Sequence, residues 1–565
     1  MSSIGPGPLL VYGPRSLDYD FGPDHPLTPK RFRAGIDLLL SVGAAPTMEP
    51  APASDAALET VHLPAYVEAV RRFSADPSRP PAMGIGISDN PAFPGMHDAA
   101  ASVADGSLRA MDAILRGDVE HAFHPGGGLH HAMPAKAWGF CIYNDPALAI
   151  MRARAAGLRV LYVDLDTHHG DGVEAVFFGD PDVLTVSFHE SGRYLFPGTG
   201  FIPDLGEGAA AGSAVNVPLE PYTGETAWLA CVRSLVPALA AAFGPDLIVS
   251  QHGADTHAWD PLAHLRVTTT AMGAAARLVD DLAHRWAGGR WLATGGGGYD
   301  AYRVVPRAWA LTWLAGAHRE APSATPAEWR SRWEAEASAF GTPGMPAGFE
   351  DPPNAGQPIL DGQAVAEIAS LEVLARVRRI VLPRLLREAE DRGRWLPDTA
   401  SRGPAAATPD GAPSIASIDA ASLASLVLAP RTISPFDPAG AHAVLLAAVR
   451  DGARQVGAVV GSSLVGVALA DRTGELLALG VAPAFRRQGL GSALRKALVA
   501  GRPAGSAMTA QVGVAERDWV EPLDVETRRE IVRRLLTVAG FELRAVSPDL
   551  SRDDPWAIAG RLPAG

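Results

Sequence analysis

The segment VDLDTHHGDG places acidic and histidine side chains at a spacing that suits a metal site. Asp164, Asp166 and His168 alternate along the chain, so on an extended strand they share one face. Carboxylate oxygens and imidazole nitrogens are ligands that zinc uses in proteins. A second segment, GADTHAWDP, offers Asp255 as a third ligand. Two aspartates and one histidine leave a position open for water, which is the pattern of a catalytic zinc.

Two further segments carry candidates for proton transfer and for stabilising negative charge. In HPGGGLHHAMP, three glycines precede His130 and His131, and paired histidines are natural general bases. Asp164 and Asp171 are candidate partners of these imidazoles. Taken alone, this segment is more typical of loop histidines without a role. In GGGGYDAYR, a run of glycines leads to Tyr299, whose phenol can donate to an oxyanion, although the segment alone also fits a phosphate-binding turn.

Three of these four segments, all but HPGGGLHHAMP, lie at the ends of predicted strands. Short apolar β-rich runs at 159–166, 183–190, 246–253 and 290–298 are separated by Ala- and Leu-rich helical stretches. Continuous apolar runs are typical of strands buried on both faces, and intervening helices imply parallel crossovers. We therefore predict an α/β domain with a mostly parallel sheet. In such sheets, ligands bind at the carboxyl ends of the strands.

A linker divides the rest of the chain into a helical extension and a second predicted domain. Residues 363–391 are predicted to form a helix broken at Pro383, followed by a linker at 393–415 that is rich in Pro, Gly, Ala and Ser. Beyond the linker, the apolar pattern predicts a helix (AGAHAVLLAAV), three strands (QVGAVVG, SLVGVALAD and GELLALGVAP) and a second helix (GLGSALRKALVA). The predicted domains are therefore 1–392, which includes a helical extension, and 416–565.

Together, the motifs resemble those of the zinc-dependent histone deacetylase family, and within it those of the bacterial acetoin utilization protein (AcuC) group, over about residues 8–390. They stand in family order along the chain: DHPLTPKR, DNPAFPG, GGGLHHA, GFCIYND, DLDTHHGDGVE, FPGTG, GADTHAWDPL and GGGGY. The resemblance implies an arginase–deacetylase α/β fold. It also implies hydrolysis of N6-acetyl-lysine to lysine and acetate.

The resemblance assigns roles to the candidate residues. It implies that zinc, or ferrous iron, is held by Asp166, His168 and Asp255. His131 would be the general base and later the acid, with His130 assisting electrostatically. The remaining catalytic residues would be Asp164 and Asp171, which orient the two histidines, and Tyr299, which polarises the acetyl carbonyl together with the metal.

The resemblance also implies a tunnel for the lysine side chain. Phe140 and Phe196 match its aromatic walls, Gly139 leaves room between them, and Asp89 matches a rim carboxylate that holds the substrate backbone. Ordinary core packing is the alternative for each aromatic residue. Arg31 matches the arginine of an acetate-release channel.

Two further matches concern a second cation and the choice of substrate. A structural potassium site is implied at Asp164, Asp166, His168, Ser187 and Phe188. Leu262 stands where family members specific for acetylated polyamines carry a glutamate. A leucine does not attract a second ammonium group, so a protein lysine fits this position better.

The segment ELLALGVAPAFRRQGLGSALRKAL predicts a strand, a turn and a helix whose N-terminal N–H groups suit a pyrophosphate. It resembles the acetyl-CoA-binding motif of GNAT-type N-acetyltransferases, which implies a smaller α+β domain. The implied coenzyme contacts are Arg486, Arg487, Gln488, Gly489 and Gly491. No tyrosine follows Tyr302 to act as the usual general acid, and Glu475 is a candidate base. An active acetyltransferase and a degenerate acetyl-CoA sensor or docking module both stay open.

Composition narrows the setting of this chemistry. The net charge is −13: the first 414 residues carry −15 and the remainder carries +2, and an acidic main body argues against nucleic acid as a partner. We find no apolar run of membrane-spanning length and no signal peptide, so no membrane partner is expected. The two cysteines, Cys141 and Cys231, are too few for a disulfide framework, and a reducing cytoplasm is the simplest compartment.

We therefore expect a metal-dependent deacetylase of acetylated proteins. The AcuC group is associated with acetyl-CoA synthetase in acetoin and acetate metabolism, which makes that enzyme the expected partner. One alternative is a deacetylase of small acetylated amines. A binuclear ureohydrolase would need a second set of metal carboxylates, and an acetyl-group reader would not need the histidine pair or the tyrosine.

Overall fold

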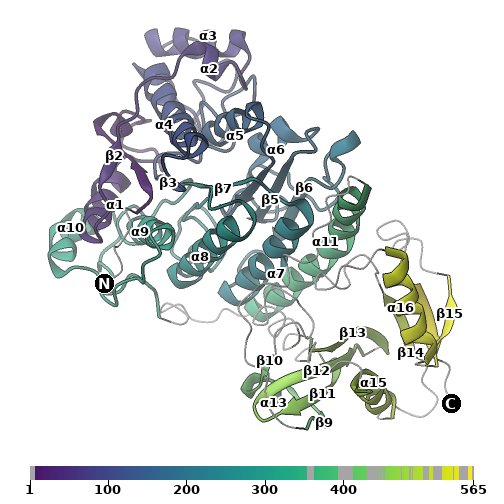
Figure 1. Ribbon diagram of the computed structural model, residues 1–565. Helices are drawn as coiled ribbons and strands as arrows, with labels where there is room; N and C mark the ends of the chain where they lie inside the picture. The colour runs from purple at the N-terminus through teal and green to yellow at the C-terminus, as the bar shows by residue number, and fades with distance from the viewer. Residues whose placement is uncertain are drawn as a thin grey trace. The chain divides into compact units, whose positions relative to one another are not determined.

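The computed structural model describes residues 7–352, 362–391, 412–428, 445, 448–449, 452–472, 474–482, 485, 488–500, 508–512, 525–538, 540–545 and 558–562. By its internal contacts the chain divides into two compact units (Figure 1). One comprises residues 1–228 and 245–370, and the other comprises 229–244 and 371–565. Almost all of the predicted linker lies outside the described residues, so the domain limits 1–392 and 416–565 stay predictions.

The first unit contains an eight-stranded sheet in which all pairs are parallel. The strand order is β2-β1-β3-β8-β7-β4-β5-β6. The strands are β1 (Leu9–Val11), β2 (Pro46–Met48), β3 (His121–His124), β4 (Val160–Asp164), β5 (Val183–Glu190), β6 (Ala214–Leu219), β7 (Leu247–Gln251) and β8 (Trp291–Thr294). The four predicted strands are confirmed as β4, β5, β7 and β8, and so is the parallel α/β class.

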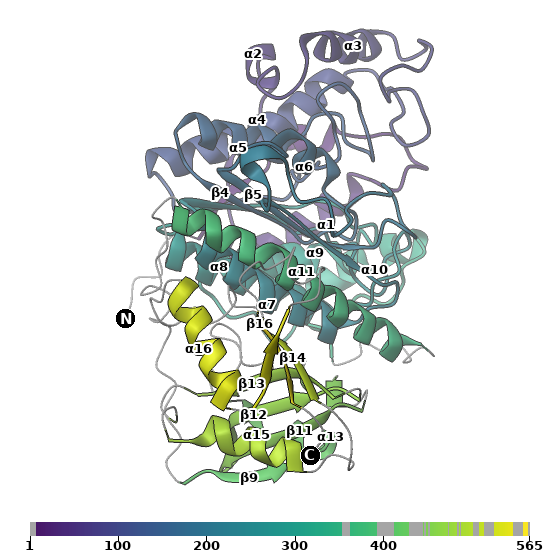
Figure 2. The ribbon, with the colours of Figure 1, turned by 90° about the vertical axis from the view of Figure 1, so that its right-hand side faces the viewer.

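Helices cover both faces of this sheet, which explains why its central strands are apolar throughout. Helices α4, α5 and α6 pack on one face, and α8 and α9 on the other (Figure 2). The helices up to residue 339 are α1 (Lys30–Ser41), α2 (Asp55–Leu58), α3 (Pro64–Ala75), α4 (Met96–Arg116), α5 (Asp145–Ala155), α6 (Asp171–Phe177), α7 (Glu225–Phe243), α8 (Thr269–Trp286), α9 (Val305–Gly316) and α10 (Ala327–Ala339). Helix α7 is long and apolar enough to cross a membrane, but 78% of its most apolar window is buried in the protein, as in a core helix.

The parallel arrangement gathers polar strand ends at one edge of the sheet. Strands β3, β4, β7 and β8 are neighbours, and each is followed by one of the polar or glycine-rich segments singled out above. A buried apolar cluster that includes residues of α4, α5 and the sheet lies beneath them. The loops that carry the chemistry are thus anchored on rigid strands.

Helix α11 (Gln363–Asp391) corrects one prediction. The sequence predicts a break at Pro383, whereas the helix continues through it. A proline inside a helix removes one hydrogen bond and crowds the preceding turn. Apolar residues are buried on both sides of the proline, namely Val377, Val381, Leu382 and Leu385, and their packing offsets that cost.

The second unit contains a mixed sheet with the order β15-β16-β14-β13-β12-β11-β9, and β10 pairs with β12. Its strands are β9 (Ser414–Ser417), β10 (Val427–Leu428), β11 (Arg454–Val460), β12 (Ser463–Ala470), β13 (Glu475–Val481), β14 (Met508–Val512), β15 (Glu542–Arg544) and β16 (Ile558–Leu562). Besides most of α7 and α11, its described helices include α13 (Ala420–Ser425), α15 (Leu490–Ala500) and α16 (Val525–Val538). This confirms the smaller α+β domain, its three predicted strands and the second helix. Most of the first predicted helix lies outside the described residues.

Candidate active site

Asp166, His168 and Asp255 converge on one buried point beyond the ends of β4 and β7. The Nδ1 atom of His168 lies 3.1 Å from Asp166 Oδ1 and 3.1 Å from Asp255 Oδ2. The three ligand atoms lie within 4.8 Å of one another, so one ion can contact all three. Burial and the neighbouring Asp166 raise the pKa of Asp255 to about 6. Two buried carboxylates this close favour a cation between them.

His130 and His131 also meet at this point, and each has a carboxylate of its own. His130 Nδ1 lies 2.7 Å from Asp164 Oδ2, and His131 Nδ1 lies 2.7 Å from Asp171 Oδ1. Asp164 is the last residue of β4, and Asp171 is the first residue of α6. All four side chains are buried. The structure therefore brings together the two pairs that the sequence left as candidates.

The contact between the two imidazoles distinguishes their protonation states. Their Nε2 atoms are 3.0 Å apart, so a single hydrogen lies between them. Burial works against a charge on His130, but Asp164 and Asp166 reverse this effect and raise its pKa to about 9. Burial and the charge of His130 lower the pKa of His131 to about 4. At neutral pH His130 is a cation whose Nε2–H donates to His131, and His131 is neutral, with its one lone pair on Nε2 as the acceptor.

Tyr299 follows β8 through the glycine-rich run and is buried beside the carboxylates. Its pKa is raised well above the usual value by burial and by Asp255 and Asp166, so the phenol stays protonated. The backbone N–H of Tyr299 donates to Asp260 Oδ2 at 2.9 Å, and the N–H of Leu262 donates to Asp260 Oδ1 at 2.9 Å. Asp260 thus fixes the tyrosine and the predicted specificity residue together.

The predicted tunnel residues lie beside His131 and Tyr299. The ring of Phe196 lies 5.1 Å from that of His131, and the ring of Phe140 lies 6.0 Å from that of Tyr299. Gly139 lies between them with φ +51°, and a Cβ there would come 2.5 Å from His131 Cδ2 and 2.8 Å from Phe196 Cε1. Glycine is therefore required on grounds of both backbone angle and space.

The rim residues lie next to this tunnel. His25 packs against Phe140 at 4.5 Å between ring centroids, and its Nε2 lies 3.3 Å from the backbone oxygen of Asp89. Asp89 is half-buried, so its carboxylate lies near solvent. Leu262 is also half-buried and packs against the apolar cluster that contains Tyr299.

The structure adds positioning residues that the sequence analysis did not single out. Asn144 Nδ2 donates to the backbone oxygens of His130 at 3.1 Å and of Ala132 at 3.0 Å, and Asn144 Oδ1 caps helix α5. Asp145 accepts the N–H groups of Gly128 and Leu129. An Asn-Asp-Pro sequence before an apolar helix is a recognisable cap, but its tie to the histidine loop is a tertiary contact.

Two other side chains act on the site from distant parts of the chain. Gln251 Nε2 donates to Asp166 Oδ2 at 2.7 Å, and the N–H of Gly297 donates to the same oxygen at 2.8 Å. Tyr19 donates its hydroxyl hydrogen to the backbone oxygen of Phe140 at 2.8 Å. Phe140 has φ +68°, so this hydrogen bond supports a strained aromatic wall.

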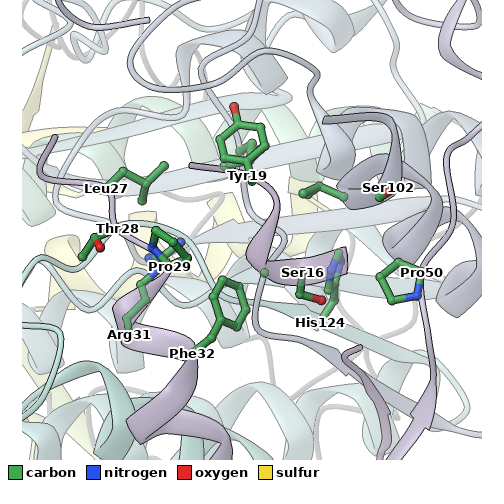
Figure 3. A pocket seen from close by; sticks show the side chains of 13 residues that line it. Ser16, Tyr19, Leu27, Thr28, Pro29, Arg31, Phe32, Pro50, Ser102 and His124 are labelled. Carbon is green, nitrogen blue, oxygen red and sulfur yellow. The ribbon is translucent and has the colours of Figure 1, made fainter. Parts of the chain in front are cut away.

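A pocket adjoins the site at Arg31 (Figure 3). Arg31 is buried and donates to the backbone oxygen of Gly296 at 2.6 Å, directly before the glycines that lead to Tyr299. The remaining lining is apolar or uncharged and includes Tyr19, Leu27, Thr28 and Phe32. Burial lowers the pKa of the neighbouring His124 to about 3, so Arg31 is the one cation among the lining residues at neutral pH.

The structure describes only part of the two remaining predicted sites, the potassium site and the coenzyme site. Ser187 pairs with Asp164 across β4 and β5, with Phe188 next to it, which sets both beside the predicted potassium ligands. In the second unit, Gln488 and Gly489 precede α15, Gly489 has φ +77°, and Gly491 is the second residue of that helix. Arg486, Arg487 and the side chain of Glu475 lie outside the described residues.

Comparison with known proteins finds relatives of both units. Residues 25–315 match the histone deacetylase domain, and residues 425–512 match the acetyltransferase (GNAT) family. The chain is 41% identical over 360 residues to acetoin utilization protein AcuC of Bacillus subtilis (strain 168), which covers 62% of this chain and 92% of that protein. AcuC of Staphylococcus aureus (strain MRSA252) is 38% identical, over 60% of this chain and 89% of that protein. A crystal structure of an HDAC homolog complexed with SAHA matches 66% of this chain and all of its own chain, with a TM-score of 0.56 and 25% identity.

Proposed function

This chain belongs to the histone deacetylase family and carries a GNAT-family domain; it is therefore a deacetylase, and we propose that it hydrolyses N6-acetyl-lysine in proteins. One observation supports this substrate chemistry. Two histidines, each paired with a carboxylate, lie next to a buried cluster of two aspartates and one histidine. An amide is a poor electrophile with a poor leaving group. Its hydrolysis needs an activated water, an oxyanion donor and a proton source, and each has a candidate here.

We propose Asp166, His168 and Asp255 as the ligands of a divalent metal, zinc or ferrous iron. The two 3.1 Å separations from His168 Nδ1 are close to the edge of about 3.3 Å expected for a tetrahedral zinc site with ligands at about 2.05 Å. Such an ion polarises the acetyl oxygen and acidifies water when it is bound. Gln251 and the N–H of Gly297 hold the outer oxygen of Asp166, which leaves its other oxygen for the ion.

The protein side chains supply the proton transfers. His131 is neutral at working pH, and its Nε2 lone pair takes the proton of the attacking water once that water replaces the His130 Nε2–H as its partner. It then returns that proton to the lysine nitrogen as the C–N bond breaks. Asp171 holds His131 Nδ1–H in place, while the His130 cation, paired with Asp164, lies beside the developing negative charge. Tyr299 donates its phenol hydrogen to the acetyl oxygen.

The tunnel supports an acetylated lysine as the group that enters. Phe140 and Phe196 enclose methylene groups, and Asp89 at the rim is placed to accept N–H groups of a peptide backbone. Arg31 offers the cation that favours release of acetate through the adjoining pocket. Leu262 carries no charge for a distal ammonium, which favours a protein lysine over a small polyamine.

We also propose a structural potassium ion at Asp164, Asp166, His168, Ser187 and Phe188, supported by the pairing of Asp164 with Ser187. For the second unit we propose binding of acetyl-CoA at Gln488, Gly489 and Gly491. Gln488 and Gly489 lie between β13 and α15, and Gly489 has the left-handed φ of +77°.

Acetylated acetyl-CoA synthetase is the proposed protein substrate, in the cytoplasm. The test is mass spectrometry of acetyl-lysine peptides and of acetylated acetyl-CoA synthetase after incubation with the zinc-loaded protein. Removal of an acetyl group lowers the peptide mass by about 42 Da. The Tyr299→Phe variant should slow this deacetylation by about 10²–10³-fold. Tyr302→Phe is the control, because that phenol contacts Glu336. Turnover of acetylated polyamines but not peptides would refute the substrate proposal.

Calorimetric titration of the full chain with acetyl-CoA tests the second unit. We expect saturable heat that is lost in a Gly489→Val variant, because a left-handed backbone favours glycine. Absence of heat at millimolar acetyl-CoA would refute both the acetyltransferase and the sensor interpretation.

A further inference from the structure

Three histidines and one aspartate form a second cluster in the first unit. His121 is the first residue of β3, Asp280 and His284 lie one turn apart on α8, and His318 follows α9. The catalytic histidines follow the other end of β3. This cluster therefore lies at the amino end of the sheet and takes no part in the site described above.

The side chains converge on a single carboxylate oxygen. Asp280 Oδ1 lies 3.1 Å from His121 Nε2, 3.3 Å from His318 Nε2 and 3.6 Å from His284 Nε2. His284 Nε2 and His318 Nε2 are 3.0 Å apart. Four ligands at about 2.05 Å from a tetrahedral zinc are separated by about 3.3 Å. The four measured separations lie on both sides of that value.

Hydrogen bonding accounts for His318, whose Nε2 lies within hydrogen-bond distance of Asp280 Oδ1 and of His284 Nε2, but it does not account for His121. Three imidazole nitrogens approach one oxygen, which has two lone pairs. His121 is 7% exposed, and its Nε2 has no hydrogen-bond partner despite the 3.1 Å approach to Asp280. A buried polar atom without a partner is costly, and a ligand bond to a metal satisfies it.

The backbone of His318 and the exposure of the cluster also suit an ion beside Asp280. His318 has φ +52°, in the left-handed position after a helix where glycine is favoured. The residue nonetheless carries an imidazole, and that ring is directed at Asp280. His284 and His318 are partly exposed, so an ion has access from solvent, whereas His121 and Asp280 form a buried floor.

We propose that His121, Asp280, His284 and His318 bind a zinc-class divalent ion. Imidazole and carboxylate ligands suit such an ion, and four protein ligands leave no position for substrate water. The site is therefore structural, and it joins β3, α8 and the segment after α9.

Metal titration of the full chain tests this site separately from the catalytic one. Chelator-stripped protein is titrated with Co²⁺, followed by visible absorption of tetrahedral Co²⁺, and bound zinc is counted by mass spectrometry after reloading. We expect two equivalents in the wild type, one in His284→Ala/His318→Ala, and one in Asp166→Ala/His168→Ala. Asp281→Asn, which changes the neighbouring carboxylate, should retain two.

The same proteins give two readouts besides stoichiometry. Zinc should raise the Tm of Asp166→Ala/His168→Ala, which keeps the second cluster. The increase in Tm should be smaller for His284→Ala/His318→Ala than for the wild type. Deacetylation by His284→Ala/His318→Ala should stay within about twofold of wild type, because the cluster does not touch the catalytic site. Equal metal content in the wild type and His284→Ala/His318→Ala, or no metal in Asp166→Ala/His168→Ala, would overturn the proposal.

Discussion

At the scale of single residues, Gly139 leaves the space beside His131 and Phe196 that the proposed tunnel needs. A Cβ at this position would come within 2.8 Å of atoms of both side chains. The glycine also has a left-handed backbone, so strain and collision both act on any substitution. These two effects can be separated, because Gly157 has φ +80° and nothing within 4 Å of its Cβ position.

We predict that Gly139→Ala lowers kcat/KM for an acetyl-lysine peptide by at least about tenfold, while Gly157→Ala leaves it unchanged. Both variants bear the cost of a left-handed alanine, about 1 kcal/mol of unfolding free energy. The loss of activity therefore isolates the collision with His131 and Phe196. Steady-state kinetics with a peptide substrate measures it, and equal activity in the two variants would contradict this account of the tunnel.

At the scale of elements, the start of α5 positions the histidine loop. Asn144 caps the helix with its oxygen and holds the loop with its amide nitrogen. His62 supports the same place: its Nε2 accepts the N–H of Asn144, and its Nδ1 lies 3.2 Å from the backbone oxygen of Met133. Burial lowers the pKa of His62 to about 4, which keeps this ring neutral.

Asn144→Asp is predicted to reduce kcat by about 10-fold or more with a smaller change in KM. The carboxylate keeps the cap but cannot donate to the oxygens of His130 and Ala132, and it repels them. Ser54→Ala, which removes the cap of α2, should cost about 1 kcal/mol of stability without a change in kcat. Full activity of Asn144→Asp would show that the loop holds its position without this side chain.

The sequence predicts the strands well, because burial on both faces leaves continuous apolar runs. It also predicts the motif residues that come together, since parallel strands end at one edge. It does not predict Tyr19 or Gln251 as supports, because their partners, Phe140 and Asp166, lie 121 and 85 residues away. The predicted break at Pro383 is wrong for a related reason: packing on both sides of a proline is a tertiary effect.

At the scale of the whole first unit, a buried ion pair ties residue 351 to the helices behind the site. Asp351 lies 2.7 Å from Arg307 Nη1 on α9, 2.8 Å from His257 Nε2 and 2.8 Å from Thr269 Oγ1 on α8. Burial opposes ionisation of Asp351, but His257 and Arg307 outweigh it and hold the pKa below the usual value. Asp351 therefore stabilises the folded state as a carboxylate.

We predict that Asp351→Asn lowers the free energy of unfolding at pH 7 by about 3–5 kcal/mol, because Arg307 is left as an unpaired buried charge. The folded pKa lies below the unfolded one, so the stabilisation is present above about pH 4 and is lost as pH falls further. The gap between wild type and variant should narrow there. Denaturant titrations at several pH values measure this gap.

Glu350→Gln is the matched control for that prediction. Glu350 is the neighbouring residue, and its carboxylate lies 3.6 Å from the guanidinium of Arg277. Each of these two side chains is 41% exposed. Exposed pairs of this kind contribute about 0–1 kcal/mol. A loss as large as that of Asp351→Asn would mean that the segment, rather than its buried charge, carries the stability.

Asp260 has a consequence for how this enzyme can change its preferences. One carboxylate holds the backbone N–H groups of both Tyr299 and Leu262, yet neither bond involves the leucine side chain. The bonds that tie the backbone at 262 to that of Tyr299 therefore do not depend on which side chain stands at 262. If Leu262 selects the substrate as proposed, a new preference needs one new side chain, and the backbone that holds Tyr299 keeps its position.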